Sequence, residues 1–219
     1  MDNPVAIIIP IHNSGVEFIK LALQMLYRST DYPFELYLIE SESTDGSSEL
    51  CDQLAREKPN IKVFHIPKKG LANAVNFGIK MSEPYDVYLT QPDVAHTRLV
   101  AYDWLRYAVN CSKNEGYGVL PTINAGGVSG PDYVDGMNWF GTWSVFITRE
   151  TINKVGLFDE QFSPGDDIDY TYRCQLANIK MASLPFWFEH HRLTKHIGDD
   201  PVLQKAMSVK FKEKWKLQS

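Results

Sequence analysis

The sequence predicts an α/β fold in which one mostly parallel, doubly wound sheet carries helices on both faces. Two observations support this fold class. Four short apolar segments alternate with three helical segments in the first 90 residues, as in a parallel sheet with right-handed crossovers. The first apolar segment, residues 5–9, reads VAIII without interruption, which is typical of a strand buried on both faces.

Hydrophobic periodicity and turn residues place the elements of the first half of the chain. Pro10 is expected to end the first strand, and Ser14-x-x-Glu17 is expected to begin the first helix as a capping box. An apolar stripe continues this helix to Leu26. The other strands are expected at residues 34–39, 61–66 and 86–89, and the other helices at residues 47–56 and 71–81.

The second half of the chain alternates less regularly. Residues 124–131 are rich in glycine and are expected to form an irregular loop. Strands are expected at residues 118–122 and 144–147, an extended segment at residues 181–188, and helices at residues 98–110, 149–155, 166–177 and 201–216.

Composition limits the class of protein. With 219 residues, of which 44% are hydrophobic and 22% charged, the chain is a folded domain and not a disordered segment. We expect one domain over residues 1–200, with residues 201–219 as a basic amphipathic helix that belongs to it or is appended to it. The net charge of −5 argues against a general affinity for nucleic acid. No apolar run reaches the roughly 18 residues that cross a bilayer.

Two features indicate the compartment. The three scattered cysteines, Cys51, Cys111 and Cys174, exclude a disulfide framework or a zinc knuckle and indicate a reducing environment. The first residues, Met1 to Pro4, contain no basic leader region. We therefore expect a cytoplasmic protein.

Polar residues follow the expected strands at their carboxyl ends, which is where open α/β sheets bind ligands. Each such segment also fits an ordinary turn or helix cap when it is taken alone. Their occurrence at one edge predicts a ligand site there. The polar residues in question are His12 and Asn13 after the first strand, Glu40 and Ser43 after the second, and Gln91 and Asp93 after the fourth.

A predicted anion site lies at the start of the third helix. Lys68 and Lys69 precede Gly70, so cationic side chains and the positive end of the helix come together. Asn73 and Asn76 lie about one turn apart on the same helix face. Because asparagine is a poor helix former, we expect both amides to face a ligand.

Four of these segments, in this order, resemble the motifs of family 2 glycosyltransferases of the GT-A fold. Residues 7–13 (IIIPIHN) resemble the family's opening strand, and residues 40–47 (ESESTDGS) resemble its Asp-Asp-Gly-Ser-Thr-Asp-Gly-Ser block. Residues 70–78 (GLANAVNFG) resemble its Gly-x-Ala-x-Ala-x-Asn-x-Gly block. Residues 91–93 (QPD) look like the Asn-Pro-Asp variant of the metal-binding Asp-x-Asp motif, as in a rhamnosyltransferase-like branch.

The resemblance continues to about residue 196. Residues 141–149 look like the family's glycine-containing strand, and residues 155–162 (VGLFDEQF) resemble its Val-Gly-Gly-Phe-Asp-Glu-x-Phe segment. Residues 165–170 (GDDIDY) resemble Gly-Glu-Asp-x-Asp-Leu, and residues 189–194 resemble a late histidine element. The match rests on the order and spacing of seven blocks.

The resemblance implies an inverting sugar transfer from a nucleotide diphosphate donor, with UDP-sugar as first choice, to an acceptor hydroxyl. It implies that Asp167 is the catalytic base, with Asp166 and Asp169 as competitors. It also implies that Asp93, with His190 or His191, holds Mn²⁺ or Mg²⁺ against the diphosphate. The two histidines alternate along an extended segment, so only one of them faces the site.

The resemblance also implies a set of donor contacts. Trp143 is expected to stack on a sugar face, and burial in the core is its alternative. Glu40 replaces the family's base-facing Asp, and as an acceptor it would select the imide N–H of uracil or thymine, or the N1–H of guanine. Gln91 replaces the first acid of the metal motif. The full set of expected donor contacts is Pro10, His12, Asn13, Glu40, Ser43, Lys69, Gly70, Asn73, Asn76, Gln91, Asp93, Gly141 and Trp143.

Two other functions compete with this interpretation. A nucleotidyltransferase of similar topology would open with a glycine-rich basic phosphate loop, which residues 9–14 do not contain. An inactive nucleotide-sugar-binding relative is disfavoured by the presence of Asp93, Asp166 and Asp167. The expected acceptor is a glycan, a lipid-linked glycan, a protein or a modified nucleobase.

The C-terminal segment combines an apolar stripe with five lysines between residues 205 and 216. One interpretation of such a helix is contact with anionic lipid headgroups, a polyanion or nucleic acid. Its alternative, packing on the domain with the lysines in solvent, is slightly favoured. The stripe consists of Leu203, Ala206, Met207, Phe211 and Trp215.

Overall fold

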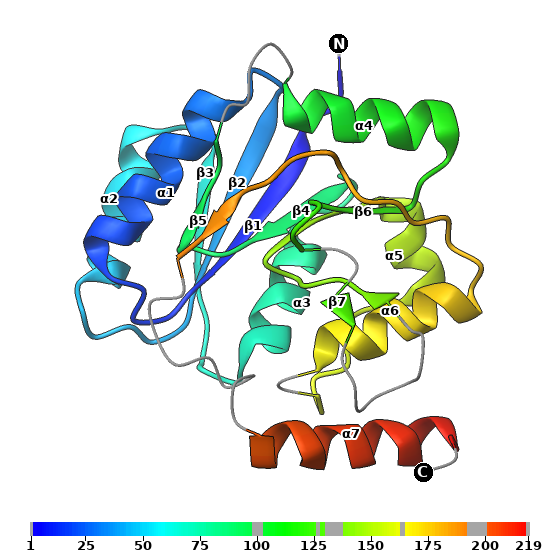
Figure 1. Cartoon of the computed structure of the whole chain (residues 1–219). Helices are drawn as coiled ribbons and strands as arrows, with labels where there is room; N and C mark the ends of the chain where they lie inside the picture. Colours follow the sequence, from blue (N-terminus) through cyan, green and yellow to red (C-terminus); the bar gives the residue numbers. More distant parts are fainter. Residues whose placement is uncertain are drawn as a thin grey trace.

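A six-stranded sheet lies between two layers of helices in the computed structural model (Figure 1), which describes residues 2–97, 103–125, 128–129, 138–162, 165–191 and 201–217. The strand order is β3-β2-β1-β4-β9-β6. In that order the strands are β3 (Ile61–His65), β2 (Phe34–Glu40), β1 (Val5–Ile11), β4 (Val87–Thr90), β9 (Ser144–Ile147) and β6 (Val119–Pro121).

Strand direction confirms the predicted mostly parallel sheet. β1 pairs in parallel with β2 and β4, and β2 pairs in parallel with β3. β9 runs antiparallel to both of its neighbours, β4 and β6. The register places Ile11, Glu40 and His65 side by side at the carboxyl ends of β1, β2 and β3. These ends form the edge at which the sequence predicts a ligand site.

Each face of the sheet has its own hydrophobic core, because alternate residues of a strand point to opposite faces. Ile7 and Ile9 of β1 pack into one core, and Ala6 and Ile8 pack into the other. The first core is covered by α1 (Val16–Ser29), α2 (Ser47–Glu57) and α4 (Trp104–Glu115). The second core is covered by α3 (Leu71–Met81), α5 (Arg149–Val155) and α6 (Asp166–Leu176).

Two short antiparallel pairs lie outside the main sheet. β5 (Val94–Ala95) pairs with β10 (Glu189–His190), which brings the segment after β4 next to the late histidines. β7 (Val128–Ser129) pairs with β8 (Asn138–Trp139). The expectation of an irregular loop over residues 124–131 therefore fails for β7; residues 126, 127, 130 and 131 lie outside the described residues.

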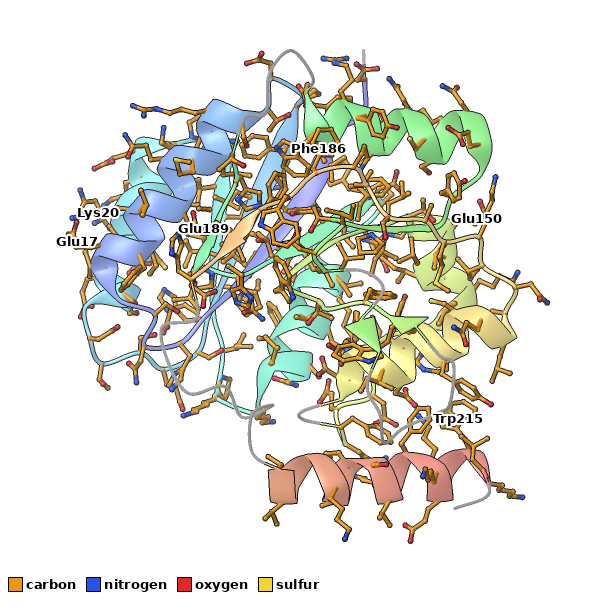
Figure 2. The ribbon with its side chains drawn as sticks, in the orientation of Figure 1. Glu17, Lys20, Glu150, Phe186, Glu189 and Trp215 are labelled. Atoms are coloured by element: carbon orange, nitrogen blue, oxygen red, sulfur yellow. The ribbon has the colours of Figure 1, made fainter. Side chains whose placement is uncertain are left out.

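The last helix, α7 (Pro201–Trp215), lies below α6 at the foot of the molecule in Figure 1. Phe211 is 0% exposed and packs with Phe162 and Ile168. Trp215 points from α7 toward α6 (Figure 2), where its Nε1 donates to Asp169 Oδ1 at 2.9 Å. These contacts favour the alternative that the helix packs on the domain. Among the described residues, no helix is long and apolar enough to cross a membrane.

The lysines of α7 correct the predicted amphipathic pattern. Lys210 Nζ donates to the Gln161 carbonyl, and Lys214 Nζ contacts Asp159 and Asp169. Long lysine stems reach back to the domain, so part of the basic side of this helix is turned inward. Conversely, Ala206 of the predicted apolar stripe is exposed.

Two local predictions at β1 and α1 are wrong. β1 continues through Pro10 to Ile11. The backbone N–H groups of even-numbered residues in β1 face β4, and the pairing of β1 with β4 ends at Ile8. The missing N–H of Pro10 therefore costs no ladder hydrogen bond. Helix α1 begins after Gly15 without a side-chain cap, since Ser14 Oγ accepts instead from the His12 N–H at 3.2 Å.

Gly78 gives a direct test of how closely α3 packs on the sheet. An alanine Cβ at this position would lie 2.5 Å from Ile8 Cγ2 and 3.2 Å from Ile39 Cγ1. Both isoleucines are β-branched and fully buried, so neither can move away at low cost. We therefore expect Gly78→Ala to destabilise the protein by about 1–3 kcal/mol in denaturant unfolding.

The sign of this effect is informative, because Gly→Ala in an open helix stabilises by about 0.5–1 kcal/mol. Lys80→Ala, at an exposed position of the same helix, is the control and should change stability by less than about 0.5 kcal/mol. A Gly78→Ala protein as stable as the wild type would contradict the close contact between α3 and the sheet.

Candidate active site

The loops that follow β1 and β2 are joined by hydrogen bonds across the edge of the sheet. The Asn13 N–H donates to Ser43 Oγ at 3.0 Å, and the Thr44 N–H donates to Asn13 Oδ1 at 2.8 Å. The Gly15 N–H donates to Asp45 Oδ2 at 2.8 Å. Asn13 has a φ of 46°, a left-handed conformation that asparagine tolerates better than most residues. The two loops therefore form one pre-organised surface.

His12 lies on the same surface with a fixed ring. Its Nδ1 is 2.6 Å from the Ser41 carbonyl oxygen, which can only accept, so Nδ1 carries the proton. In the neutral ring, Nε2 is then left as an acceptor. Pro10, which the sequence also places in the site, is half-buried at the end of β1.

Glu40 is almost completely enclosed at the end of β2, with 2% of its surface exposed. Its Oε1 accepts from the Ser43 N–H at 2.6 Å, and its Oε2 accepts from His65 Nδ1 at 2.8 Å and from Ser48 Oγ at 3.3 Å. Burial on its own would raise the pKa of Glu40, but the hydrogen bonds from Ser43 and His65 outweigh it and hold this pKa below its usual range. The contact between Glu40 and a nucleobase stays a prediction.

Asp93 follows β4 and faces a late histidine. Asp93 Oδ1 lies 3.4 Å from His190 Nε2, and the His190 ring stacks on Trp143 with centroids 4.6 Å apart. His191 instead lies with its Nε2 3.7 Å from Glu189 Oε2, and its backbone N–H donates to the Asp93 carbonyl at 2.8 Å. The structure therefore brings the His190 ring, and not that of His191, to the Asp93 carboxylate.

Neighbouring residues support this arrangement. A Cβ on Gly141 would lie 2.6 Å from the Trp143 indole, so glycine allows the indole to lie against the backbone. Gln91 accepts from the Val94 N–H through its backbone carbonyl at 3.2 Å, which closes the turn that presents Asp93. Trp143 thus contacts a histidine in the structure, and its stacking on a sugar stays a prediction.

The three acids at the start of α6 differ in their surroundings. Asp169 is 0% exposed and paired: Arg173 Nε lies 2.9 Å from its Oδ2, and Lys214 Nζ lies 2.6 Å from its Oδ1. Asp169 therefore joins α6 to α7, and both of its carboxylate oxygens have charged partners. Asp166 is 5% exposed, and its Oδ2 has no hydrogen-bond partner among the described residues. Asp167 is the most exposed of the three.

Asp166 and Asp167 are both weaker acids than an ordinary aspartate. It raises the pKa of Asp166 to about 6, and the nearby Asp169 adds to this shift. Burial, followed by repulsion from Asp166, raises the pKa of Asp167 well above its usual range. Raised pKa values in two adjacent carboxyls are typical of groups that transfer protons.

The predicted anion site at α3 is only partly supported. Gly70 begins the helix with a φ of 98° and no side-chain cap, so the first N–H groups of α3 are free of such a cap, and Lys69 is exposed beside them. Asn76, however, is buried and bonded in both directions to the Phe158 backbone, with distances of 2.9 Å. The structure does not bring Asn76 to the open edge.

Sequence reasoning missed the partner of these asparagines. Glu160 accepts from Asn73 Nδ2 at 3.1 Å and from Asn76 Nδ2 at 3.0 Å, which fixes residues 158–160 against α3. The hydrogen bonds from Asn76 and Asn73 also lower the pKa of Glu160. Sequence reasoning also missed His65. It is the last residue of the third strand, and Glu40 was selected because it is the last residue of the second.

The fold of this chain matches the folds of solved structures from other organisms. TarS of S. aureus, residues 1–349 in complex with UDP-GlcNAc, matches with a TM-score of 0.69 at 17% identity, over 90% of this chain and 61% of that one. The mannosyltransferase PcManGT of Pyrobaculum calidifontis, in complex with GDP-Man and Mn²⁺, matches with a TM-score of 0.60 at 19% identity, over 97% and 71%. These likenesses show that this chain has the GT-A fold.

The chain belongs to glycosyl transferase family 2, because the model of that family matches residues 6–162. Glycosyltransferase GlyG of Streptococcus pneumoniae serotype 4 is 27% identical over 94 residues, which is 42% of this chain and 31% of GlyG. The uncharacterized glycosyltransferase EpsJ of Bacillus subtilis is 36% identical over 77 residues, 35% of this chain and 22% of EpsJ. The matched part is less than a third of either relative.

The raised pKa of Asp166 can be tested by measuring how protein stability depends on pH. A carboxyl with a pKa of about 6 in the folded state and 3.8 otherwise supports folding only at low pH, and this contribution is lost as pH rises through 6. Asp166→Asn should therefore be more stable than the wild type at pH 7, by about 1–3 kcal/mol, with the difference vanishing toward pH 4. Thermal unfolding across this pH range measures it.

Asp159→Asn is the matched control of opposite sign. Burial would raise the pKa of Asp159, but the hydrogen bond from Lys214 prevails and lowers it. Its contribution to stability is present above its usual pKa and is lost as pH falls, so Asp159→Asn should destabilise at pH 7. If both variants lose stability at pH 7, Asp166 is not a destabilising buried acid.

Proposed function

We propose that this chain transfers a sugar with inversion from a nucleotide diphosphate donor, UDP-sugar first, to an acceptor hydroxyl, with the assistance of Mn²⁺ or Mg²⁺. The main observation behind this proposal is the pairing of Asp93 with His190 at the end of β4. This pair lies beyond the same sheet edge as the joined loops after β1 and β2. The proposal extends the family assignment to mechanism and donor.

Asp93 and His190 are the residues that would hold the cation. Asp93 Oδ1 is buried without a hydrogen bond among the described residues, so an acceptor atom is available beside an imidazole. Small hard cations are usually bound by one or two protein carboxylates together with waters and substrate phosphates, and imidazole nitrogen suits Mn²⁺ less than oxygen does but is tolerated. A bound cation would neutralise charge on the departing diphosphate.

Asp167 is the proposed base. It would accept the proton of the acceptor hydroxyl while that oxygen attacks the anomeric carbon opposite the leaving diphosphate. A carboxyl is most effective in this role when its pKa approaches the working pH, and burial together with Asp166 raises the pKa of Asp167 in that direction. The place of Asp167 at the start of α6, more exposed than Asp166, supports access by an acceptor.

The surface of the joined loops is the proposed nucleoside site. Its uncommitted polar groups include His12 Nε2, which the Ser41 contact leaves as an acceptor. Uridine is the first choice because the TarS neighbour is in complex with UDP-GlcNAc. Guanosine is the second choice, since the PcManGT neighbour is in complex with GDP-Man.

Asp93→Asn tests the cation site by calorimetry with UDP. The amide keeps the side-chain volume but removes the charge that attracts a cation. We expect UDP affinity in Mn²⁺ to fall by about tenfold or more, a change of about 1.4 kcal/mol, while affinity without Mn²⁺ stays unchanged.

Glu189→Gln is the control for Asp93→Asn, because it removes an exposed carboxylate from the same small sheet. It should leave UDP affinity unchanged under both conditions. Equal affinities of Asp93→Asn and the wild type in Mn²⁺ would exclude Asp93 from the cation site.

Asp167→Asn tests the base. The isosteric amide cannot accept the proton, so the transfer rate should fall by about 10²–10⁴-fold. UDP affinity should stay within about threefold of the wild type, because the carboxylate acts on the acceptor. Asp166→Asn is the comparison. A dead Asp166→Asn enzyme beside an active Asp167→Asn enzyme would assign the role of base to Asp166.

A further inference from the structure

The corner between β2 and β3 contains a histidine to which the proposed mechanism gives no role. His65 lies beside Glu40 in the parallel register. Its Nδ1 is 2.8 Å from Glu40 Oε2, and its Nε2 is 2.9 Å from Asp52 Oδ1 on α2. A neutral imidazole has a single N–H and can donate to only one of these carboxylates. The geometry therefore favours the imidazolium, which donates to both.

A line of hydrogen bonds leads from His65 to both loops of the proposed nucleoside site. The Glu40 side chain, which is 3% exposed, accepts from His65 on one oxygen and from the Ser43 N–H on the other, at 2.6 Å. Ser43 Oγ then accepts from the Asn13 N–H at 3.0 Å. A buried carboxylate that loses a charged donor must find another partner or take up a proton. The position of the first loop thus depends on the third strand.

The groups around His65 come from two elements. β2 supplies Glu40, and α2 supplies Asp52 and Ser48, whose Oγ lies 3.5 Å from His65 Nδ1. Cys51 of α2 is also close to both carboxylates, but burial and then Glu40 raise its pKa to about 12, so the thiol keeps its proton. The hydrogen bonds to Glu40 and then to Asp52 raise the pKa of His65. The corner therefore holds one titrating cation between two anions.

We propose that His65 is a positioning residue for the nucleotide. As an imidazolium between Glu40 and Asp52, it holds the Glu40 carboxylate against Ser43 and keeps the two loops in the arrangement that binds a nucleoside diphosphate. This inference rests on the proposed function, since it assumes that these loops form the nucleoside site. Nucleotide affinity should therefore depend on pH through His65, which lies outside the residues proposed to contact the nucleotide.

The direction of the dependence follows from the raised pKa of His65. The stabilising contacts are complete below the ordinary histidine pKa of 6.5 and are lost as pH rises through the higher value in the folded protein. Nucleotide affinity should accordingly fall on the alkaline side. Asp52 is half-exposed, so its removal should lower the pKa of His65 and move this fall to lower pH without unfolding the protein.

UDP affinity at constant Mn²⁺, measured by calorimetry between pH 5.5 and 8.5, tests this proposal in the wild type and in His65→Gln. The ratio of the two affinities cancels the titration of UDP and of the other histidines. We expect the wild type to bind about tenfold more tightly at the acidic end, with the two proteins converging as pH rises. The UDP affinity of Asp52→Asn should converge with that of His65→Gln at a lower pH than the wild-type affinity does. Glu49→Gln removes an exposed acid from the same helix and should have the affinity of the wild type at each pH.

A second readout needs no nucleotide. Hydrogen exchange of the Ser43 amide should be several-fold faster in His65→Gln than in the wild type at pH 6, because this amide donates to Glu40. Unchanged Ser43 exchange, or an affinity ratio that is constant with pH, overturns the positioning role. A wild type that binds neither UDP nor GDP at any pH, with Ser43 exchange as expected, overturns the proposed function and with it the role of the corner in nucleotide binding.

Discussion

The register in which β1 pairs with β2 and β4 brings together Glu40 and the loops that carry Asn13 and Ser43. Because β1 is central and parallel to both neighbours, its last residue, Ile11, is level with Glu40 of β2. The loops that follow can then exchange the hydrogen bonds of Asn13 with Ser43 and Thr44. A shift of one residue would exchange the two faces of β1, which pack into different cores. Burial of these cores therefore fixes the geometry of a polar edge.

Two pairs of neighbouring acids have pKa values that are shifted in opposite directions, and their partners account for the difference. Asp159 and Glu160 have charged or amide donors, and the pKa of each is lowered. Asp166 is buried, Asp167 is half-buried beside it, and the pKa of each is raised. Paired acids stabilise the fold at neutral pH, whereas the raised pair destabilises it. A local loss of stability of this kind, here at Asp166 and Asp167, is typical of sites that transfer protons.

The part of the fold that depends on local pattern could be predicted from the sequence. The periodic helix α3 has the bounds that hydrophobicity indicates, and the strand ends select Glu40 and Asp93. Contacts between residues far apart in the chain could not be predicted. Ser14 looks like a helix cap, but Gly15 begins α1 because its N–H is held by Asp45, thirty residues away. A local motif carries no information on such a partner.

The same limit applies to the candidate site. Asn76 has the sequence signature of a ligand-facing amide, yet it bonds to the Phe158 backbone, 82 residues away. The alternation of His190 and His191 predicts that one faces the site, but only the pairing of β10 with β5 decides that it is His190. Lys214 reads as a surface lysine, and its pairing with Asp169 appears only when α7 is placed against α6.

We propose that a cation and a nucleoside diphosphate meet at the end of β4. Paramagnetic broadening by Mn²⁺ tests this most directly. In amide spectra of the wild type with UDP, substoichiometric Mn²⁺ broadens the signals nearest to the ion. We expect the amide signals of Asp93, His190 and Trp143 to broaden first, and we expect excess Mg²⁺ to restore these signals. Broadening centred on another part of the chain, with these three signals unchanged, would contradict it.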